Sequence, residues 1–292
     1  MQFTNYWQQF EHTGRVEDYL KYLQSAEKEK PLAGAECKSP LVDCSGGAGI
    51  QADLKTFAAH GVYGMSVITA VTVQNTLGVA AVHDIPENII SGQLDAVFSD
   101  IVPDAVKIGM VSKMETIRTI AKKLKQYQPK HVVYDPVMVS TSGHSLLAPD
   151  CVQAVMEYLI PRAGVITPNI PEAEVLSGME ITSKEEMVKA AEYISKKHCR
   201  NILIKGGHFA QDADDLLFSE GEIFWFAGKR IETKNTHGTG CTLSSAIASN
   251  LAKGDSLNKA VERAKRYITR AIESGLEIGH GNGPVDHSVS AD

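Results

Sequence analysis

Asn235-Thr236-His237-Gly238-Thr239-Gly240-Cys241-Thr242 is the stretch from which the fold of this chain can be worked out. A predicted strand, 222–231, precedes it, and residues 241–251 carry apolar side chains at helical spacing. The stretch therefore joins a strand to a helix. Its two glycines leave backbone N–H groups free to point at an anion, and the helix N-terminus adds about half a positive charge. This pattern indicates an anion-binding turn.

A thiol follows the two glycines in the first turn of the same helix. We expect the helix N-terminus to lower the pKa of Cys241 below the ordinary value of about 8.5. An anion site and a proton acceptor within one turn of each other suit phosphoryl transfer, in which the protein mainly positions reactants and neutralises charge. A glycine-rich turn with a structural cysteine accounts for the local spacing equally well.

Composition limits the classes of protein that need to be considered. The 292 residues suffice for one large α/β domain, and 43% hydrophobic with 22% charged residues is typical of globular proteins. A net charge of −6 argues against a nucleic-acid or anionic-membrane surface. No apolar run reaches the ~18 residues of a membrane span. The five scattered cysteines contain no CxxC pair, so we expect a reducing, cytoplasmic setting.

The first 30 residues differ in pattern from the rest. They carry two short aromatic and apolar stripes at helical spacing and end in a charged run before Pro31. We predict a helical appendage over residues 1–30 and a single domain over residues 31–292. The sequence leaves open whether the appendage packs on its own domain, extends into solvent or binds a partner.

After residue 45, strands and helices alternate, which predicts a parallel sheet wrapped by helices. Residues 65–73 form an almost continuous apolar run, expected as one strand buried on both faces. Further strands are predicted at 106–109, 131–134, 164–167 and 201–204. Helices are predicted at 50–58, 89–98, 151–159, 187–194 and 257–272, and another at 117–124 after a capping box of Ser112 and Glu115. Residues 215–219 and 222–231 are expected to add an antiparallel edge.

Ligands of open α/β sheets bind beyond the carboxyl ends of the strands, so polar residues that follow predicted strands are candidates for the site. Asn169 and Glu172 could present oxygens to a hydrated Mg²⁺, although a polar first turn of a helix explains them as well. Asp135 could hold a metal-bound water or cap a turn. Lys205 precedes two glycines and could place its charge against a phosphate, or it could be a solvated lysine.

The amide of Gln74 offers one acceptor and one donor side by side. This pair complements the edge of an aminopyrimidine, although a glutamine that caps a loop is the simpler explanation. Other phosphate motifs are weak or missing, since no GxxxxGK[ST] sequence occurs and residues 46–49 lack the GxGxxG spacing.

Taken together, these segments resemble the bacterial hydroxymethylpyrimidine/phosphomethylpyrimidine kinases of the ribokinase-like superfamily. The similarity runs in order from about residue 43 to 287, more than four-fifths of the chain. The segments that carry it are DCSGGAGIQADLKTF (43–57), SVITAVTVQNT (66–76), KIGM (107–110), DPVM (135–138), TPNIPEAEVLSG (167–178), KGGH (205–208), NTHGTGCTLS (235–244) and GHGNGP (279–284).

The resemblance implies an α/β, ribokinase-like fold, with a central, mostly parallel sheet flanked by helices and a small antiparallel edge. It implies a kinase that uses ATP and Mg²⁺ to phosphorylate 4-amino-5-hydroxymethyl-2-methylpyrimidine and then its monophosphate, in thiamine biosynthesis. Expected partners are these small molecules only, with no nucleic acid or membrane, and the expected assembly is a homodimer.

The resemblance also implies a role for each matching residue. Cys241 would be the catalytic base, and the anion hole would be formed by Gly238, Thr239 and Gly240. The pyrimidine would be bound by Gln74, Asp43, Ala48 and Met110. The ATP phosphates would be bound by Lys205, Asp135, Asn169 and Glu172, with Mg²⁺ held through water by Asn169 and Glu172.

Two points qualify this interpretation. The pyridoxal and pyridoxine kinases share the cysteine-containing fold, but they resemble this chain less at Gln74-Asn75 and at the KGGH run.

The expected first strand, 34–43, is atypical because Lys38 and Pro40 are poor residues for a central strand. We therefore expect this strand to be short, shifted or absent. A ligand-binding protein without turnover and an interaction scaffold built on residues 1–30 are the alternatives to an enzyme.

Overall fold

The computed structural model describes residues 34–38, 41–138, 147–207, 209 and 213–291. The part of the chain from Gly34 onward forms one compact unit. The predicted appendage, residues 1–30, lies outside the described residues.

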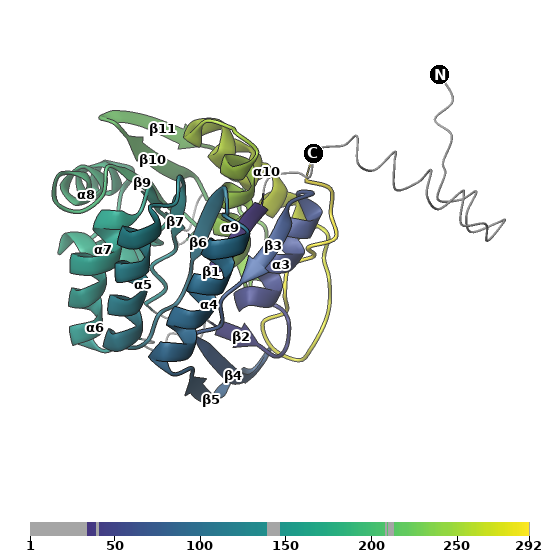
Figure 1. The fold of residues 1–292 in the computed structure, drawn as a ribbon. Helices are drawn as coiled ribbons and strands as arrows, with labels where there is room; N and C mark the ends of the chain where they lie inside the picture. Colours follow the sequence, from purple (N-terminus) through teal and green to yellow (C-terminus); the bar gives the residue numbers. More distant parts are fainter. Residues whose placement is uncertain (1–33, 39–40, 139–146, 208, 210–212, 292) are drawn as a thin grey trace, which may run out of the picture. The chain divides into compact units, whose positions relative to one another are not determined.

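A large sheet runs through the centre of this unit (Figure 1). Within the described residues its strand order is β11-β10-β9-β8-β7-β6-β1-β3. All pairs from β3 to β9 are parallel, and β10 is antiparallel to both β9 and β11. The strands are β1 (Gly34–Lys38), β3 (Tyr63–Ser66), β6 (Ala105–Ile108), β7 (Val132–Tyr134), β8 (Val165–Ile166), β9 (Asn201–Ile204), β10 (Asp215–Ser219) and β11 (Glu222–Phe226). The predicted parallel sheet with an antiparallel edge is confirmed.

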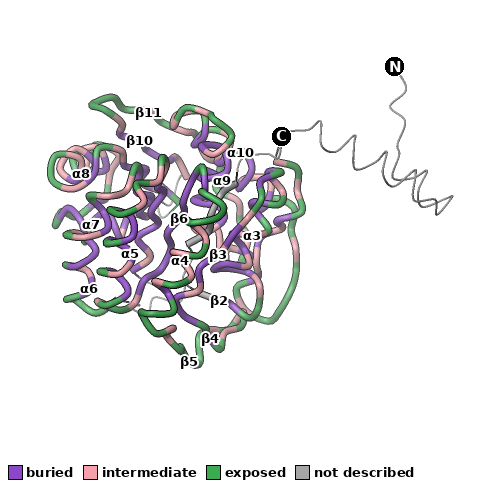
Figure 2. The backbone as a smooth tube through the Cα atoms, in the orientation of Figure 1, coloured by how far each residue is buried: buried purple, intermediate pink, exposed green. Residues whose placement is uncertain are grey.

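Helices cover both faces of this sheet. One face packs against α4 (Glu87–Asp100), α5 (Met114–Tyr127), α6 (Pro149–Ala154) with the turns Val155–Leu159 and Ile160–Arg162, α7 (Ile170–Ser177) and α8 (Lys184–Lys197). The other packs against α3 (Gly49–Ala59), α9 (Thr239–Ala252) and α10 (Leu257–Glu273). In β7, Val132 belongs to the first cluster and Val133 to the second, as the twofold period of a strand requires. Figure 2 shows the buried residues along the strands between these layers. None of the helices within the described ranges is long and apolar enough to cross a membrane.

The predicted single strand at 65–73 is wrong. Residues Tyr63–Ser66 form β3, whereas Ala70–Asn75 form β4, the middle strand of a second sheet. Between them the Gln93 side chain takes the place of a neighbouring strand, because its amide bonds both the N–H and the C=O of Ile68, at 2.9 and 3.0 Å. The sequence does not show this break, because the residues on both sides of it are apolar. In β4 burial alternates, and Val71 and Val73 are exposed.

The small sheet also contains strands that the sequence analysis did not predict as such. They are β2 (Leu41–Asp43), parallel to β4, and β5 (Gly78–Asp84), antiparallel to it. Every residue of β5 is at least partly exposed. A half-covered strand of small and polar residues such as His83 carries little of the pattern used for prediction.

Of the three outcomes expected for the first strand over residues 34–43, a short strand is confirmed, whereas a shifted or absent strand is wrong. Residues Gly34–Lys38 form β1 in the middle of the large sheet, parallel to both β3 and β6. The chain then changes sheets, since β1 ends at Lys38 and β2 begins at Leu41. The objection that Pro40 removes a ladder donor therefore applies to neither strand. The backbone ladder on both sides places β1 although its side chains are poor strand formers.

The predicted capping box of Ser112 and Glu115 is not formed. Helix α5 begins at Met114, and its N-cap residue, Lys113, makes no side-chain cap. The Ser112 hydroxyl donates instead to Oδ1 of Asp84, at the end of β5, over 2.7 Å. A tertiary partner has displaced the local one.

Candidate active site

A cavity of about 690 Å³ opens at the carboxyl ends of β6, β7, β8 and β9. It contains both Cys241 and Gln74, which are 167 positions apart in sequence, as their numbers show. Of the twelve residues predicted to form the site, all but Asp43 line this cavity: Gln74, Ala48, Met110, Asp135, Asn169, Glu172, Lys205, Gly238, Thr239, Gly240 and Cys241.

The glycine-rich turn begins helix α9, with Gly238 as N-cap at φ +80°. This left-handed backbone favours glycine. Any larger residue at position 238 would also clash, because its Cβ would lie 1.9 Å from the carbonyl oxygen of Gly47. A Cβ at Gly47 would in turn lie 2.6 Å from the ring of His237. Two glycine-rich segments that lie about 190 residues apart in sequence thus pack backbone against backbone. The first-turn amides of α9 have no intrahelical acceptor.

Cys241 is half-buried at the start of α9 and lines the cavity. Burial raises the pKa of the Cys241 thiol to about 11, although the charge of Lys107 and the backbone N–H of Gly49 lower it. Lys107 is fully buried and is already paired with Asp53 at 3.0 Å. The expectation that the helix N-terminus would lower this pKa is therefore wrong, because the cost of desolvating the thiolate exceeds the stabilisation that these groups supply.

A buried ion pair lies beside the glycine turn. Lys205 Nζ is 2.8 Å from Oδ1 of Asp135, and the Thr167 hydroxyl donates to the same oxygen over 2.9 Å. Burial alone would raise the pKa of Asp135, but the charges of Lys205 and Lys107 lower it. A Cβ at Gly240 would lie 3.3 Å from Lys205 Nζ. The lysine charge is therefore placed within contact of the first turn of α9.

Asn169 and Glu172 form the capping box of helix α7. Asn169 Oδ1 accepts from the Glu172 backbone N–H at 2.9 Å, and Glu172 Oε2 accepts from the Asn169 N–H at 2.8 Å. The Met138 N–H donates to Glu172 Oε1 at 3.3 Å. Burial raises the pKa of Glu172 to about 7, since nearby Asp135 adds to the effect and Lys205 only partly offsets it. The local explanation, a polar first turn of a helix, is correct, and the same two residues also line the cavity.

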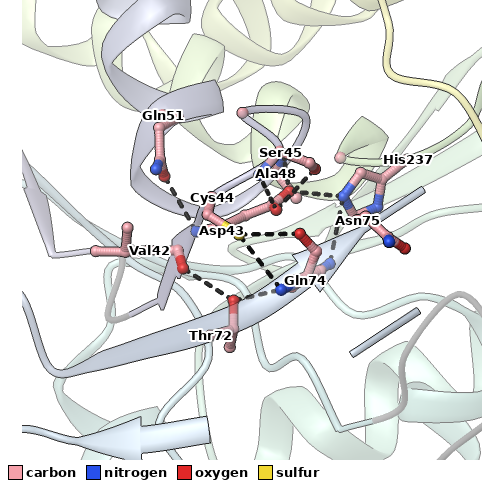
Figure 3. Close-up of polar contacts among 12 residues, drawn as sticks. Val42, Asp43, Cys44, Ser45, Ala48, Gln51, Thr72, Gln74, Asn75 and His237 are labelled. Carbon is pink, nitrogen blue, oxygen red and sulfur yellow. Dashed lines mark hydrogen bonds and ion pairs between the residues drawn. The ribbon is translucent and has the colours of Figure 1, made fainter. Parts of the chain in front are cut away.

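Asp43 does not line the cavity. Its buried carboxylate holds the turn that follows β2 (Figure 3). Oδ1 accepts from the backbone and hydroxyl of Ser45, and Oδ2 accepts from the Ala48 N–H at 2.9 Å and from His237 Nε2 at 2.8 Å. Burial would raise the pKa of Asp43, but the hydrogen bonds from His237 and Ser45 lower it to about 2. This residue positions the wall of the cavity.

Two residues of this site were missed by the sequence analysis. His237 lines the cavity and contacts both Asp43 and Gln74 (Figure 3). It immediately precedes Gly238 in the stretch that identified the turn, which is the signal that could have found it. Thr72 is buried and shares a strand face with Gln74, two residues further along. The assignment of 65–73 to a strand buried on both faces concealed this residue.

One cavity at the ends of parallel strands thus combines a helix start whose first-turn amides have no intrahelical acceptor, a lysine–aspartate pair and a thiol. Fold and site define a phosphotransferase of the ribokinase-like class. The chain belongs to the phosphomethylpyrimidine kinase family, whose model matches residues 43–286.

Individual relatives agree with this assignment. The hydroxymethylpyrimidine/phosphomethylpyrimidine kinase of Rhizobium meliloti is 55% identical over 84% of this chain and 93% of that protein. The chain spans about half the length (51%) of a bifunctional thiamine biosynthesis protein of Geobacter sulfurreducens, with 51% identity. Among solved structures, phosphomethylpyrimidine kinase from Clostridium difficile matches with TM-score 0.74 and 48% identity, over 82% of this chain and 99% of that one. Pyridoxal kinase from Staphylococcus aureus with ADP matches with TM-score 0.82 but 35% identity, over 89% and 94%.

The raised pKa of Cys241 predicts a slow alkylation that accelerates with pH. With a pKa of about 11, only about one thiol in 3,000 is ionised near pH 7.5, so the rate should rise about tenfold per pH unit without a plateau up to about pH 9.5. Mass spectrometry of peptides after timed iodoacetamide treatment measures this rate. A plateau below pH 9 would show that the thiol is instead activated in the ligand-free protein.

Proposed function

We propose that residues 31–292 form an ATP-dependent kinase that phosphorylates 4-amino-5-hydroxymethyl-2-methylpyrimidine and then its monophosphate to the diphosphate. The observation that carries the proposal is that Cys241 and Gln74 line the same cavity, with the glycine turn between strand ends and helix α9. The amide of Gln74, which can hydrogen-bond an aminopyrimidine, and the thiol of Cys241, which can accept a hydroxyl proton once ionised, therefore line one cavity. The family assignment supports the same substrates.

The pyrimidine ring would lie against the apolar part of the cavity wall. Ala48 and Met110 are both buried to the same extent, 8% exposed, and line the cavity. Val79 and Val82 of β5 contribute from the small sheet. Gln74 projects from the same sheet, so its amide can bind the polar edge of the ring while these apolar side chains contact its faces.

The hydroxymethyl oxygen would attack the γ-phosphoryl group of ATP in line. The Cys241 thiolate accepts the hydroxyl proton as the oxygen–phosphorus bond forms and the bond to ADP breaks. The backbone amides at Gly238, Thr239 and Gly240 stabilise the equatorial phosphoryl oxygens. Because the thiol has a high pKa, it is a strong base once ionised but is mostly protonated at neutral pH.

The residues near Lys205 fit the triphosphate and a hydrated magnesium ion. The staphylococcal pyridoxal kinase was solved with ADP and with AMP-PCP, which supports the use of ATP in this fold. Among the described residues, no group of three or more His, Cys, Asp or Glu side chains is arranged to hold a metal ion. Two carboxylates, Asp135 and Glu172, with Asn169 beside them, suit Mg²⁺ that keeps waters and phosphate oxygens as its other ligands. Bound Mg²⁺ would neutralise charge on the phosphates, and Lys205 would place its charge near the same oxygens.

The second phosphorylation uses a nucleophile that is already anionic. The monophosphate has no hydroxyl proton to lose at neutral pH, so this step depends on Cys241 less than the first. It relies instead on the same amides and on the charge of Lys205.

A coupled ATPase assay of the whole chain with three acceptors tests the proposal. We expect turnover with the aminopyrimidine alcohol and with its monophosphate, and much weaker turnover with pyridoxal, which lacks the aminopyrimidine edge that Gln74 complements. Pyridoxal matters as a comparison because solved pyridoxal kinases share the fold. Preference for pyridoxal, or no ATP consumption with any of the three, would refute the proposal.

Replacing the thiol separates the two steps. Cys241→Ala should lower kcat/KM of the first phosphorylation by ~10²-fold or more and lower the second far less. In the wild type, kcat/KM of the first step should rise about tenfold per unit between about pH 7.5 and pH 9.5, following the thiol of the free enzyme, and this rise should vanish in the variant. Steady-state kinetics for each acceptor measures both effects. Small, equal losses in the two steps would contradict the assignment of Cys241 as base.

Glu172 should make the need for magnesium depend on pH. Since its pKa is about 7, the carboxyl is mostly protonated at pH 6 and mostly ionised at pH 8. Its attraction for hydrated Mg²⁺ is therefore lost as pH falls, and the half-saturating Mg²⁺ concentration should rise about tenfold between about pH 8 and pH 6. Glu172→Gln should raise this concentration and remove its pH dependence. Glu174→Gln, on the same helix, is the matched control, and identical behaviour of the two variants would refute this role.

We further propose that two copies of the chain pair through the outer face of the small sheet. On β4, Thr72 faces the cavity side, whereas Val71 and Val73 are 40% and 60% exposed on the opposite face. Leu77, in the turn to β5, is 69% exposed. Adjacent exposed apolar side chains of this kind mark interaction surfaces.

We also propose that the protein works in the cytoplasm, because the proposed role of Cys241 requires a free thiol and thiols stay reduced in that compartment.

This pairing predicts a dimer in solution that Val73→Asp weakens. A charge in the middle of an apolar interface would remain unpaired there, which should raise the dimer dissociation constant at least tenfold. Sedimentation velocity over a concentration series measures it, with Ile278→Asp, an exposed apolar residue elsewhere, as control. A monomeric wild type would contradict the proposal.

A further inference from the structure

The amide of Gln74 lies between two polar neighbours. Its Oε1 is 3.2 Å from Thr72 Oγ1, and its Nε2 is 3.4 Å from His237 Nε2 (Figure 3). The oxygen and nitrogen of a side-chain amide have nearly the same shape, so the choice of which end faces which neighbour follows from the hydrogen-bond partners.

Asp43 determines which atom of the Gln74 amide can lie next to His237. Its Oδ2 lies 2.8 Å from His237 Nε2, and a carboxylate whose pKa is held near 2 is ionised and can only accept. His237 Nε2 must therefore carry the proton of this bond. A protonated ring nitrogen cannot also accept from the amide NH₂, so an amide nitrogen at this position would place a donor against a donor.

The hydrogen bonds of Thr72 independently indicate the same orientation of the Gln74 amide. The Thr72 hydroxyl has one proton, and the Val42 carbonyl oxygen, 2.8 Å away, accepts it. The hydroxyl then offers only lone pairs to Gln74, and an amide oxygen there would place an acceptor against an acceptor. Turning the amide by 180° removes both conflicts, because NH₂ then donates to Thr72 and the amide oxygen shares the N–H of His237 with Asp43.

We propose that Thr72 and His237 are positioning residues that hold the Gln74 amide with its oxygen towards His237 and its nitrogen towards Thr72, and so determine which way round an aminopyrimidine edge is bound. One amide hydrogen and one oxygen lone pair remain for the ligand. The exocyclic amine then binds on the His237 side, and the adjacent ring nitrogen binds on the Thr72 side. This inference deepens the proposed function and rests on it.

A fixed amide discriminates between analogues that exchange donor and acceptor. In the 4-oxo analogue of the substrate, the amine is replaced by a carbonyl acceptor and the ring nitrogen carries a proton. If Gln74 is held in the proposed orientation, the carbonyl of this analogue lies against the amide oxygen, and its ring N–H lies against the amide NH₂. A site with polar groups that cannot turn should reject it by about 100-fold or more in kcat/KM.

The test compares the 4-amino and 4-oxo alcohols in Thr72→Val and Thr72→Ser. Valine keeps the shape of threonine but removes the oxygen that holds the amide nitrogen, so His237 alone then opposes the turned amide that suits the 4-oxo analogue. We expect the 4-amino to 4-oxo ratio of kcat/KM to fall at least tenfold in Thr72→Val and to stay within about threefold of the wild-type ratio in Thr72→Ser. KM for ATP should stay unchanged in both variants.

A merely structural role for Thr72 would lower kcat/KM for the two analogues by the same factor and leave their ratio as in the wild type, which would overturn the inference. Calorimetric binding of the two alcohols without ATP gives the ratio independently of turnover. A wild-type protein that binds the 4-amino alcohol selectively but transfers no phosphoryl group would refute the proposed function and support the inference. A wild type that binds both analogues equally would overturn the inference.

Discussion

The buried carboxylate of Asp43 is the constraint on which the site depends. A charge removed from water must be met by several donors, and this one is met by Ser45, Ala48 and His237. These donors belong to two segments that are almost 200 residues apart. By bonding both, Asp43 brings the turn after β2 against the start of α9, close enough for Gly47 and Gly238 to pack without side chains. This contact brings the first-turn amides of α9, the thiol of Cys241 and Gln74 to one cavity.

Burial affects the ionisable groups of the cavity in opposite directions, according to their partners. Asp43 and Asp135 are surrounded by donors or cations that lower the pKa of each carboxyl despite burial. Cys241 and Glu172 lack enough such partners, so burial raises the pKa of each. The two groups that we propose to handle the proton and the hydrated cation are thus the ones whose charge is costly in the free protein. Ligands that bring positive charge would favour their ionised forms.

Much of the fold could be predicted because parallel strands buried on both faces have a strong pattern. The strand at Asn201–Ile204 and the antiparallel strand at Asp215–Ser219 lie where the sequence places them. The small sheet was not predicted because Ala70–Asn75 continues the apolar run before it. The hydrogen bonds between Gln93 of helix α4 and the backbone of Ile68, at the break between the two strands, leave no mark in that run. The first strand is short, as expected, but the sequence did not show that it stays in the large sheet, where backbone pairing on both sides sets its place.

By itself the sequence determined what local spacing controls: a helix starting at a glycine turn, a polar first helical turn at Asn169 and Glu172, and polar residues at successive strand ends. Backbone conformation and short-range hydrogen bonds act within a few residues, so their signals survive in a linear pattern. Only the tertiary structure decided the state of Cys241, the supporting place of Asp43 and the contacts of His237 and Thr72 with Gln74. Desolvation and hydrogen bonding between distant segments depend on what the fold brings together, and no spacing along the chain records that.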